Sequence, residues 1–506
     1  MPMRLSRRSL VKGIVGGVAI SAFPKISHTA GMDGFQIGYF VPSTWDNLLY
    51  PARLNWLAWA NLVSLRLQPL VRLAGENRIE YVLAERIYEN GAGDVWFVEI
   101  KSGVFWNGPA GRESFTLEQV ESNILSWMKD DLSQIGAEFR RKVNKVTLEQ
   151  GPSGSPRLKI ELIQPDHQFF YTFTSYAALI GHPEDKGLFT PTSRGTGPFK
   201  VDSFEEGMSL RFVPEDSYWD PSHKALFPVT FRQGQSASSS AFDFIPDVSP
   251  DRWKQLQGEG MAIKQNALAD ALVFHMDCRD GLFQDPAVRQ ALRFLIDPQV
   301  MITSVYGMGR AADHTHVASI HLDSPSGREV RAMYDPDRAR QLLGGRLLAF
   351  PLFYPARFAW QKNAAEAYAA AAAKVGVMVT PVACGDEFGD RWNTYRGGLT
   401  AIKWQHRPLA QQLFSKVYTT GAEWNLSGWS HPGFDKAVSE LMSAPLNTPA
   451  VQAMETAMRL LQKEGPMVHA LWFDCNKGYN PERVAASTVQ VGSGGYIYAE
   501  KLRRIA

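Results

Sequence analysis

The stretch that decides the fold class is residues 347–382, LLAFPLFYPARFAWQKNAAEAYAAAAAKVGVMVTPV. Residues 347–354 form an apolar run of strand length, and residues 377–382 form a second run that is rich in valine. Residues 363–375 lie between them and are rich in alanine, which favours a helix, and Gly376 follows where helices commonly end. The stretch therefore predicts a β-α-β unit, which should cross over in the right-handed sense.

Strand and helix patterns also alternate elsewhere in the chain. Residues 95–100, VWFVEI, predict one strand, and residues 104–106 predict a second strand that stops at the turn pair Asn107-Gly108. Thr116 stands before the helical pattern of residues 117–127, where a capping residue is expected. The serine-rich residues 236–240 predict a loop. Together these patterns indicate a mixed α/β protein.

The N-terminus predicts an export signal. Residues 6–12, SRRSLVK, contain two adjacent arginines, and the apolar run of residues 13–23 follows at once. Paired arginines before a short apolar stretch are typical of the twin-arginine route. The run is shorter than the roughly 20 apolar residues that span a bilayer. We therefore predict that residues 1–30 are a twin-arginine signal peptide, and that the mature protein is soluble and periplasmic.

Composition limits the classes of partner. Without residues 1–30 the chain has 48 basic and 51 acidic residues, so it lacks the excess positive charge on which nucleic-acid binding relies. Its length exceeds what one hydrophobic core usually serves, which predicts two or more lobes. Three cysteines allow at most one internal disulfide, and the sequence leaves open which pair of Cys278, Cys384 and Cys475 is joined, if any.

Catalytic motifs are missing from the sequence. It contains no Gly-x-Ser-x-Gly, no phosphate-binding loop and no His-Glu-x-x-His, so we expect neither an enzyme nor a bound cofactor. His314 and His316, with Asp313 before them and His321 after them, form the only compact group of metal-ligand types. In an extended chain the two histidines would face the same side and share a metal ion. The alternative, which we favour, is a solvated polar loop without metal.

Several short segments, taken in their order along the chain, carry a resemblance to a known family. They are residues 68–71, 82–85, 97–108, 115–120, 195–201, 218–219, 283–292, 296–297, 334–336 and 430–435. In order and spacing they resemble the family-5 extracellular solute-binding proteins. That family includes the periplasmic dipeptide-, oligopeptide- and nickel-binding proteins of ABC importers.

The resemblance implies a two-lobed periplasmic binding protein fold of the α/β class, in which the lobes close over a ligand. By that analogy, lobe 1 is built from residues 31–63, 187–265 and 474–506. An extra subdomain of mixed α+β structure belongs to lobe 1 and occupies residues 64–186. Lobe 2 then comprises residues 266–473.

The resemblance also points to a ligand-binding segment. In peptide-binding relatives, a Trp-x-x-Asp-Tyr segment supplies a carboxylate to the free amino group of the peptide. This chain has KWQHRP at residues 403–408, which contains no acid. Arg407 would instead favour an anionic group, unless it points to solvent. The other candidates for the wall of the ligand site are Trp404, His406, Trp424, Asn425, Trp429, Tyr176 and Trp45.

The resemblance implies that the protein captures a small solute. This solute is either peptide-like or another small organic compound, and anionic compounds are included. The protein would act as a monomer and deliver this solute to an inner-membrane ABC permease. A first alternative is a nickel or metal-chelate carrier, with His314, His316 and His406 as neutral ligands. A second alternative is a periplasmic ligand sensor with no role in transport.

Overall fold

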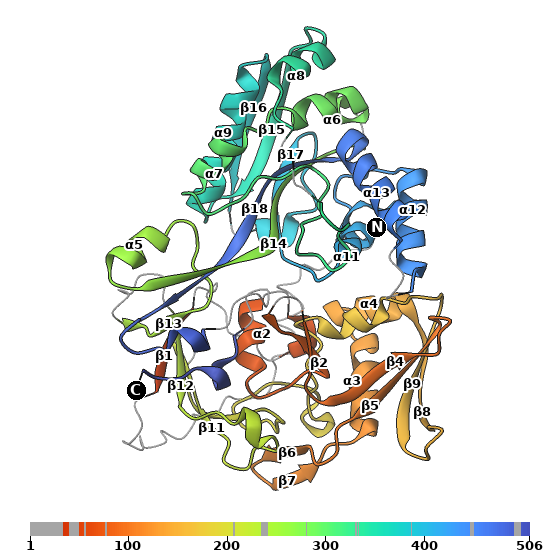
Figure 1. Ribbon diagram of the computed structural model, residues 1–506, viewed down its shortest axis with the longest axis vertical. Coiled ribbons are helices and arrows are strands. Elements are labelled where there is room, and N and C mark those ends of the chain that lie inside the picture. The colour runs from red at the N-terminus through yellow and green to blue at the C-terminus, as the bar shows by residue number, and fades with distance from the viewer. Residues whose placement is uncertain are drawn as a thin grey trace, which may run out of the picture. The chain divides into compact units, whose positions relative to one another are not determined.

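The β-α-β unit predicted from residues 347–382 forms one end of a ten-stranded sheet (Figure 1). β15 (Leu348–Pro355) lies parallel to β16 (Val377–Cys384), and α9 (Ala359–Ala373) packs against both strands. Alternate residues in the first part of β15 are buried, because successive side chains of a strand point to opposite faces. The prediction is confirmed, although α9 begins four residues earlier than the alanine-rich pattern suggested.

The computed structural model describes residues 34–39, 50–54, 57–75, 78–205, 208–233, 241–279, 281–328, 331, 333–385, 387–445, 450–489 and 497–505. Residues 34–506 form one compact unit. The predicted signal peptide, Trp45 and the serine-rich residues 236–240 lie outside the described residues.

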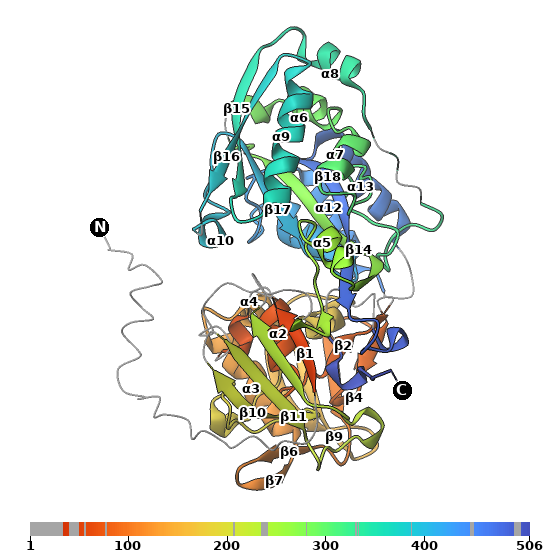
Figure 2. The same cartoon turned by 90° about the vertical axis from the view of Figure 1, so that its left-hand side faces the viewer.

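The large sheet has the strand order β10-β11-β12-β1-β13-β18-β14-β17-β15-β16. Its two longest strands, β14 (Ala262–Met276) and β18 (Met467–Tyr479), pair in antiparallel fashion along most of their length. Figures 1 and 2 show these two strands side by side, and both run from the group of elements around β1 into the group around β17.

The first group of elements shares one hydrophobic core, and we call it lobe 1. Its strands are β1 (Phe35–Tyr39), β2 (Val71–Leu73), β3 (Ile79–Tyr81), β4 (Ala84–Glu89), β5 (Val95–Ile100), β6 (Phe105–Gly108), β7 (Gly111–Ser114), β8 (Val143–Gln150), β9 (Pro156–Leu162), β10 (Phe199–Glu205), β11 (Ser209–Pro214), β12 (Val229–Gln233) and β13 (Phe244–Ile245). Its helical segments are η2 (Pro51–Arg53), α2 (Leu57–Val63), α3 (Leu117–Lys129), α4 (Gln134–Lys142), η4 (Phe169–Thr174), η5 (Pro183–Asp185), η6 (Pro221–His223), η10 (Ala486–Thr488) and η11 (Ala499–Lys501).

The second group shares two further cores, and we call it lobe 2. Besides β15, β16 and α9 it contains β17 (Leu399–Trp404), η8 (Gly281–Gln284), α6 (Pro286–Arg293), α7 (Pro298–Ser304), α8 (Pro336–Leu343), α10 (Phe388–Arg391), α11 (Ala410–Leu413), η9 (Phe414–Tyr418), α12 (Pro432–Ser443) and α13 (Val451–Glu464). A small separate cluster of buried residues includes Leu256 of α5 (Trp253–Gly258). The residue limits given above for the lobes and the extra subdomain remain predictions.

Local predictions within lobe 1 are confirmed, with one shift. β5 matches the predicted strand, and it joins β4, β8 and β9 in a four-stranded antiparallel sheet. α3 begins directly after Thr116, whose backbone N–H donates to Gln119 Oε1 at 2.9 Å. The turn predicted at Asn107-Gly108 lies two residues later, because β6 continues to Gly108 and β7 resumes at Gly111.

Cys278 and Cys384 are free thiols, so they do not form a disulfide with each other.

None of the helices in the described ranges is long and apolar enough to cross a bilayer.

Candidate ligand-binding site

An aromatic wall forms where β17 ends at Trp404. The Trp404 indole N–H donates to Nε2 of the buried His275 at 2.8 Å. The Trp404 ring stacks on Trp424, with 5.7 Å between ring centroids and 21° between ring planes. The structure therefore brings together two of the aromatic residues that the sequence suggested, and it fixes the orientation of Trp404 from within lobe 2.

Next to this wall, an ion pair joins the two lobes. Lys416 lies in η9, a π-helical turn, and its Nζ is 5.1 Å from the centroid of the Trp424 ring. The same Nζ is 2.5 Å from Oε2 of Glu138, which belongs to α4 of lobe 1. Both side chains are largely buried, with exposed fractions of 16% and 12%. An ammonium and a carboxylate thus meet at the contact between the lobes.

Glu138 is held in its ionised form. Its Oε1 lies 3.4 Å from Lys142 Nζ and accepts a hydrogen bond of 3.1 Å from the Thr172 hydroxyl. Burial alone would raise the pKa of Glu138, but the positive charges of Lys416 and Lys142 outweigh burial and hold this pKa well below its usual range. Burial lowers the pKa of Lys416, although Glu138 opposes this shift. The Glu138 carboxylate is therefore already paired with two cations of the protein, Lys416 and Lys142.

Arg407 is a second cation in this region of the structure, and its contacts differ from those of Lys416. It is half-buried, and its Nη1 donates to the His406 carbonyl at 3.1 Å. Burial raises the pKa of Tyr176, and the nearby positive charge of Arg407 opposes that rise, so residues predicted from two distant segments are neighbours. Among the described residues, no carboxylate forms an ion pair with Arg407. Its guanidinium therefore keeps donors that a ligand can use.

Comparison with known proteins supplies the family. The family model described as bacterial extracellular solute-binding proteins, family 5 Middle, matches residues 78–424, which is more than half of the chain. This protein belongs to family 5 of the bacterial extracellular solute-binding proteins. It is 23% identical to the peptide transport periplasmic protein SapA of Salmonella typhimurium over 351 residues, which cover 62% of this chain and 62% of SapA. The match to heme-binding protein A of Haemophilus influenzae is 25% identical and covers 41% of this chain and 40% of the relative.

Solved structures establish the two-lobed periplasmic binding protein fold. NikA from Brucella suis in complex with Fe(III)-EDTA superposes with a TM-score of 0.78 and 20% identity, over 93% of this chain and 100% of NikA. A dipeptide-binding protein from Pseudoalteromonas sp. SM9913 in complex with Met-Leu superposes with a TM-score of 0.75 and 15% identity, over 94% of this chain and 100% of the other. The expected α/β two-lobed fold is thereby confirmed.

Three other residues suggested from the sequence have their contacts inside lobe 2 of this family-5 chain. Asn425 Nδ2 donates to the carbonyls of Thr419 (3.0 Å) and Trp429 (2.8 Å). Trp429 is buried and packs against the ring of Phe434, at 5.2 Å between ring centroids. His406 is buried, and burial lowers its pKa to about 4. These contacts hold the loop that carries Trp424.

The loop of His314 and His316 is neither extended nor solvated, so the extended geometry and the solvent exposure predicted from the sequence are both wrong. The two residues have φ values of 59° and 55°, in the left-handed region, and both are buried. His316 Nδ1 lies 2.6 Å from the Tyr418 hydroxyl, and the loop is anchored by a buried ion pair between Arg328 and Asp313. Within the described part of the chain there is no group of three or more metal-ligand side chains that could hold an ion.

The residues that sequence reasoning missed are Glu138, Lys416 and Asp323. Glu138 and Lys416 are 278 positions apart, and no local pattern announces such a pair. Asp323 accepts hydrogen bonds from the backbone N–H groups of Ala410 (2.8 Å) and Gln411 (3.0 Å), and burial raises its pKa to about 6. It thereby fixes the start of α11, the helix that leads to Lys416.

The ion pair between the lobes can be tested in the absence of ligand. The substitution Glu138→Gln keeps the side-chain size and removes its charge, and a hydrogen bond to a charged group is worth about 1.5–3 kcal/mol. Because Lys416 regains water when the lobes separate, we expect this energy to appear as a shift from closed to open molecules, by roughly 10- to 150-fold. Small-angle X-ray scattering should report a larger radius of gyration. The exposed Glu455→Gln should leave it unchanged, and an unchanged radius in Glu138→Gln would contradict the role of this pair.

Proposed function

We propose that this family-5 chain is the solute-binding component of an ABC importer and that it captures a small organic anion between its lobes. Arg407 carries the proposal. It is a half-buried cation beside Tyr176, it has no ion-paired carboxylate among the described residues, and it stands in the segment where peptide-binding relatives carry an acid. A guanidinium binds a carboxylate or phosphate through two parallel hydrogen bonds, and an ammonium group would be repelled.

The neighbours of Arg407 support the same ligand charge. Lys416 is close enough for Arg407 to lower its pKa further, and the carboxylate that pairs with Lys416, Glu138, is shared with Lys142. Trp404 and Trp424 provide flat apolar surface next to this charge. We assign Arg407, Tyr176, Trp404 and Trp424 to the ligand site, and the anionic group of the solute to Arg407.

The remaining elements of the function follow from the family and the N-terminal sequence. We propose that the protein is exported by the twin-arginine route, acts in the periplasm as a monomer without catalytic activity, and delivers its solute to an inner-membrane permease. The paired arginines of residues 6–12 support the route. The family model supports solute binding.

A ligand panel tests the proposal. Thermal unfolding should be followed with peptides, sugars, acidic sugar conjugates, organic acids and metal chelates. A true ligand present at about 100 times its dissociation constant adds roughly 2.7 kcal/mol to the free energy of unfolding. We expect stabilisation by anionic members of the panel. If every class leaves the transition unchanged, or if only cationic solutes stabilise the protein, the proposed ligand is wrong.

A metal chelate is the second candidate. The superposition on NikA in complex with Fe(III)-EDTA favours it, because a chelate built from carboxylates is itself an anion and suits Arg407. His314 and His316 are buried within lobe 2, so we expect recognition of the chelate as a whole and not of a free ion. Calorimetry with free nickel and with a nickel carboxylate chelate separates the two. Binding of free nickel alone would contradict this candidate.

A further inference from the structure

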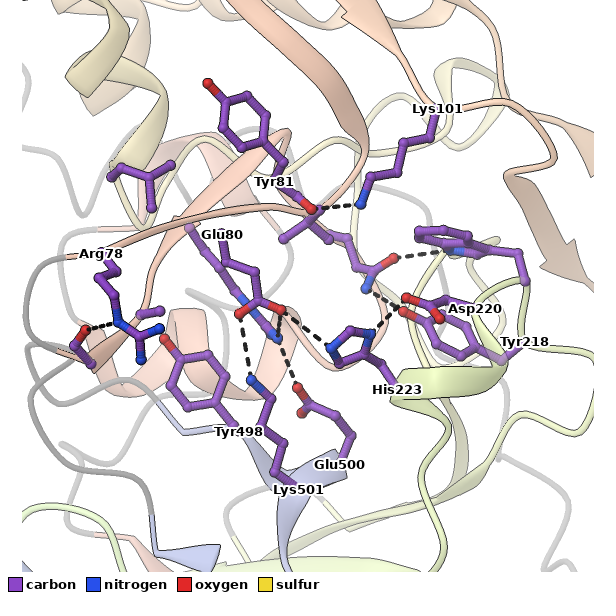
Figure 3. Close-up of a pocket in the computed structure, with 17 residues that line it drawn as sticks. Arg78, Glu80, Tyr81, Lys101, Tyr218, Asp220, His223, Tyr498, Glu500 and Lys501 are labelled. Carbon is purple, nitrogen blue, oxygen red and sulfur yellow. Dashed lines mark hydrogen bonds and ion pairs between the residues drawn. The ribbon is translucent and has the colours of Figure 1, made fainter.

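A pocket lies within lobe 1 (Figure 3). Its volume is about 380 Å³, which falls in the range of about 300–1,000 Å³ common for small-molecule sites. Residues from three distant segments line it, within residues 68–101, 218–223 and 498–501. None of the residues assigned above to the ligand site belongs to this lining.

The three carboxylates of the pocket already have partners within the protein, and two of them pair with Arg72. Glu80 forms two hydrogen bonds of 3.0 Å with Arg72, and Glu500 accepts a third of 3.0 Å from the same guanidinium. Asp220 lies 2.7 Å from His223 Nδ1. Burial would raise the pKa of Glu80, but Arg72 and Lys501 outweigh it and lower this pKa, so the charge of Glu80 is balanced inside the protein.

Three cations of the pocket keep donors that the described residues do not use. Lys101 Nζ gives one hydrogen bond of 2.6 Å to the Tyr81 carbonyl, and an ammonium has three N–H groups. Arg78 donates from Nε to the Gly75 carbonyl at 3.2 Å, which leaves its terminal amino groups. Lys501 Nζ is 3.5 Å from Glu80. Figure 3 shows these three side chains around the pocket on different sides.

The charge and the walls of the pocket define a ligand class. With Arg72, the lining carries four permanent cations against three carboxylates, so the net charge is positive. Aromatic faces lie beside the two ammonium groups: Lys101 Nζ is 5.7 Å from the Trp219 ring centroid, and Lys501 Nζ is 4.8 Å from that of Tyr498. We propose that this pocket binds a small organic anion through its carboxylate or phosphate oxygens, with Lys101, Arg78 and Lys501 as donors.

The test uses the whole protein and two defined probes, inorganic phosphate and citrate, against chloride at matched ionic strength. Calorimetry should detect binding of at least one probe, and the responding probe tells phosphate from carboxylate recognition. The double variant Lys101→Met and Lys501→Met should weaken binding at least tenfold. The control variant Lys129→Met and Lys145→Met, which removes two exposed lysines of lobe 1 outside the pocket, should bind as the parent does.

Further measurements show which site is responsible for binding of the probe. Adding Lys101→Met and Lys501→Met to the Arg407→Ala variant should still weaken probe binding at least tenfold relative to Arg407→Ala alone, which separates this pocket from the proposed solute site. The exposed Arg78→Gln leaves the buried network intact and should weaken binding about three- to tenfold, so the test stands even if the double variant folds poorly. Hydrogen exchange should slow at residues 78–82 and 498–501 when the probe is bound. Absence of binding to the parent, or equal affinity in the parent, Arg78→Gln and the double variant, would overturn the proposal.

Discussion

Lowering the pH from 7 to 5 is expected to destabilise the folded protein by several kcal/mol, because lobe 2 buries six histidines in their neutral form. They are His275, His314, His316, His321, His406 and His469. Burial lowers the pKa of each, to about 3 for His275, His314 and His316 and to about 4 for His406, and well below the ordinary value for the other two.

The sign follows from proton binding. In the unfolded chain these histidines take up protons near pH 6.5, whereas in the folded protein burial holds the pKa of each well below that value. Between these values the unfolded state holds more protons, so stability falls as the pH falls. At pH 5 each group contributes about 2 kcal/mol, and six such groups set an upper bound of about 12 kcal/mol. Asp323, whose pKa is raised to about 6, acts in the opposite direction by about 1.4 kcal/mol.

Chemical denaturation at pH 8, 7, 6 and 5 measures this effect. His469→Phe is the informative variant, because both ring nitrogens of His469 are buried without a hydrogen-bond partner among the described residues. We expect it to retain stability at pH 8 and to reduce the proton uptake on unfolding by about one near pH 5. A free energy of unfolding that is the same at pH 7 and pH 5 would show that the histidines are not held neutral.

Arg407→Ala is expected to weaken binding of the anionic solute by about 2–5 kcal/mol, because it leaves the ligand charge buried and unpaired. Arg407→Lys should recover only part of this loss, since an ammonium cannot reproduce the two parallel hydrogen bonds of a guanidinium. Calorimetry with the solute identified in the ligand panel measures both variants.

The control for this prediction is Arg459→Ala, which removes an exposed arginine on α13. It should bind the solute as the parent does. Circular dichroism and ligand-free melting of Arg407→Ala should match the parent, because the hydrogen bond of the Arg407 side chain within the described part of the chain goes to the adjacent carbonyl. If both Arg407 variants bind as tightly as the parent, Arg407 is outside the ligand site and the anionic ligand loses its support.

Local structure was predictable wherever the deciding interactions are close in the chain. The unit of β15, α9 and β16 follows from apolar runs and an alanine-rich segment, and α3 follows from its cap and apolar face. The same reasoning placed the turn after β6 two residues too early, because Asn107 and Gly108 still pair with Arg112 and Gly111.

The candidate site was only partly predictable, because its partners come from distant segments. Trp404 and Arg407 were found through the resemblance of one segment to the family, but their neighbour Glu138 belongs to a helix with no family motif. The loop of His314 was wrongly predicted to be solvated, because a polar sequence does not show whether its side chains are buried in the fold. Its burial depends on Arg328, fifteen residues beyond Asp313, and on Tyr418, which lies 102 residues beyond His316.

The C-terminal segment of the chain has a consequence for the order of folding. It completes lobe 1, because the Ile497 backbone N–H donates to Asn61 Oδ1 at 3.0 Å and Glu500 pairs with Arg72, 428 residues earlier. The elements assigned to lobe 2 lie between residues 281 and 464, so they can assemble on the ribosome before residues 497–501 emerge, whereas lobe 1 requires those residues. Contacts between residues so far apart in the chain slow folding, because the entropy of closing the long loop is lost before these contacts can stabilise the structure. A chain that stops a few residues short would therefore leave the ribosome with a finished second half and an unfinished first half.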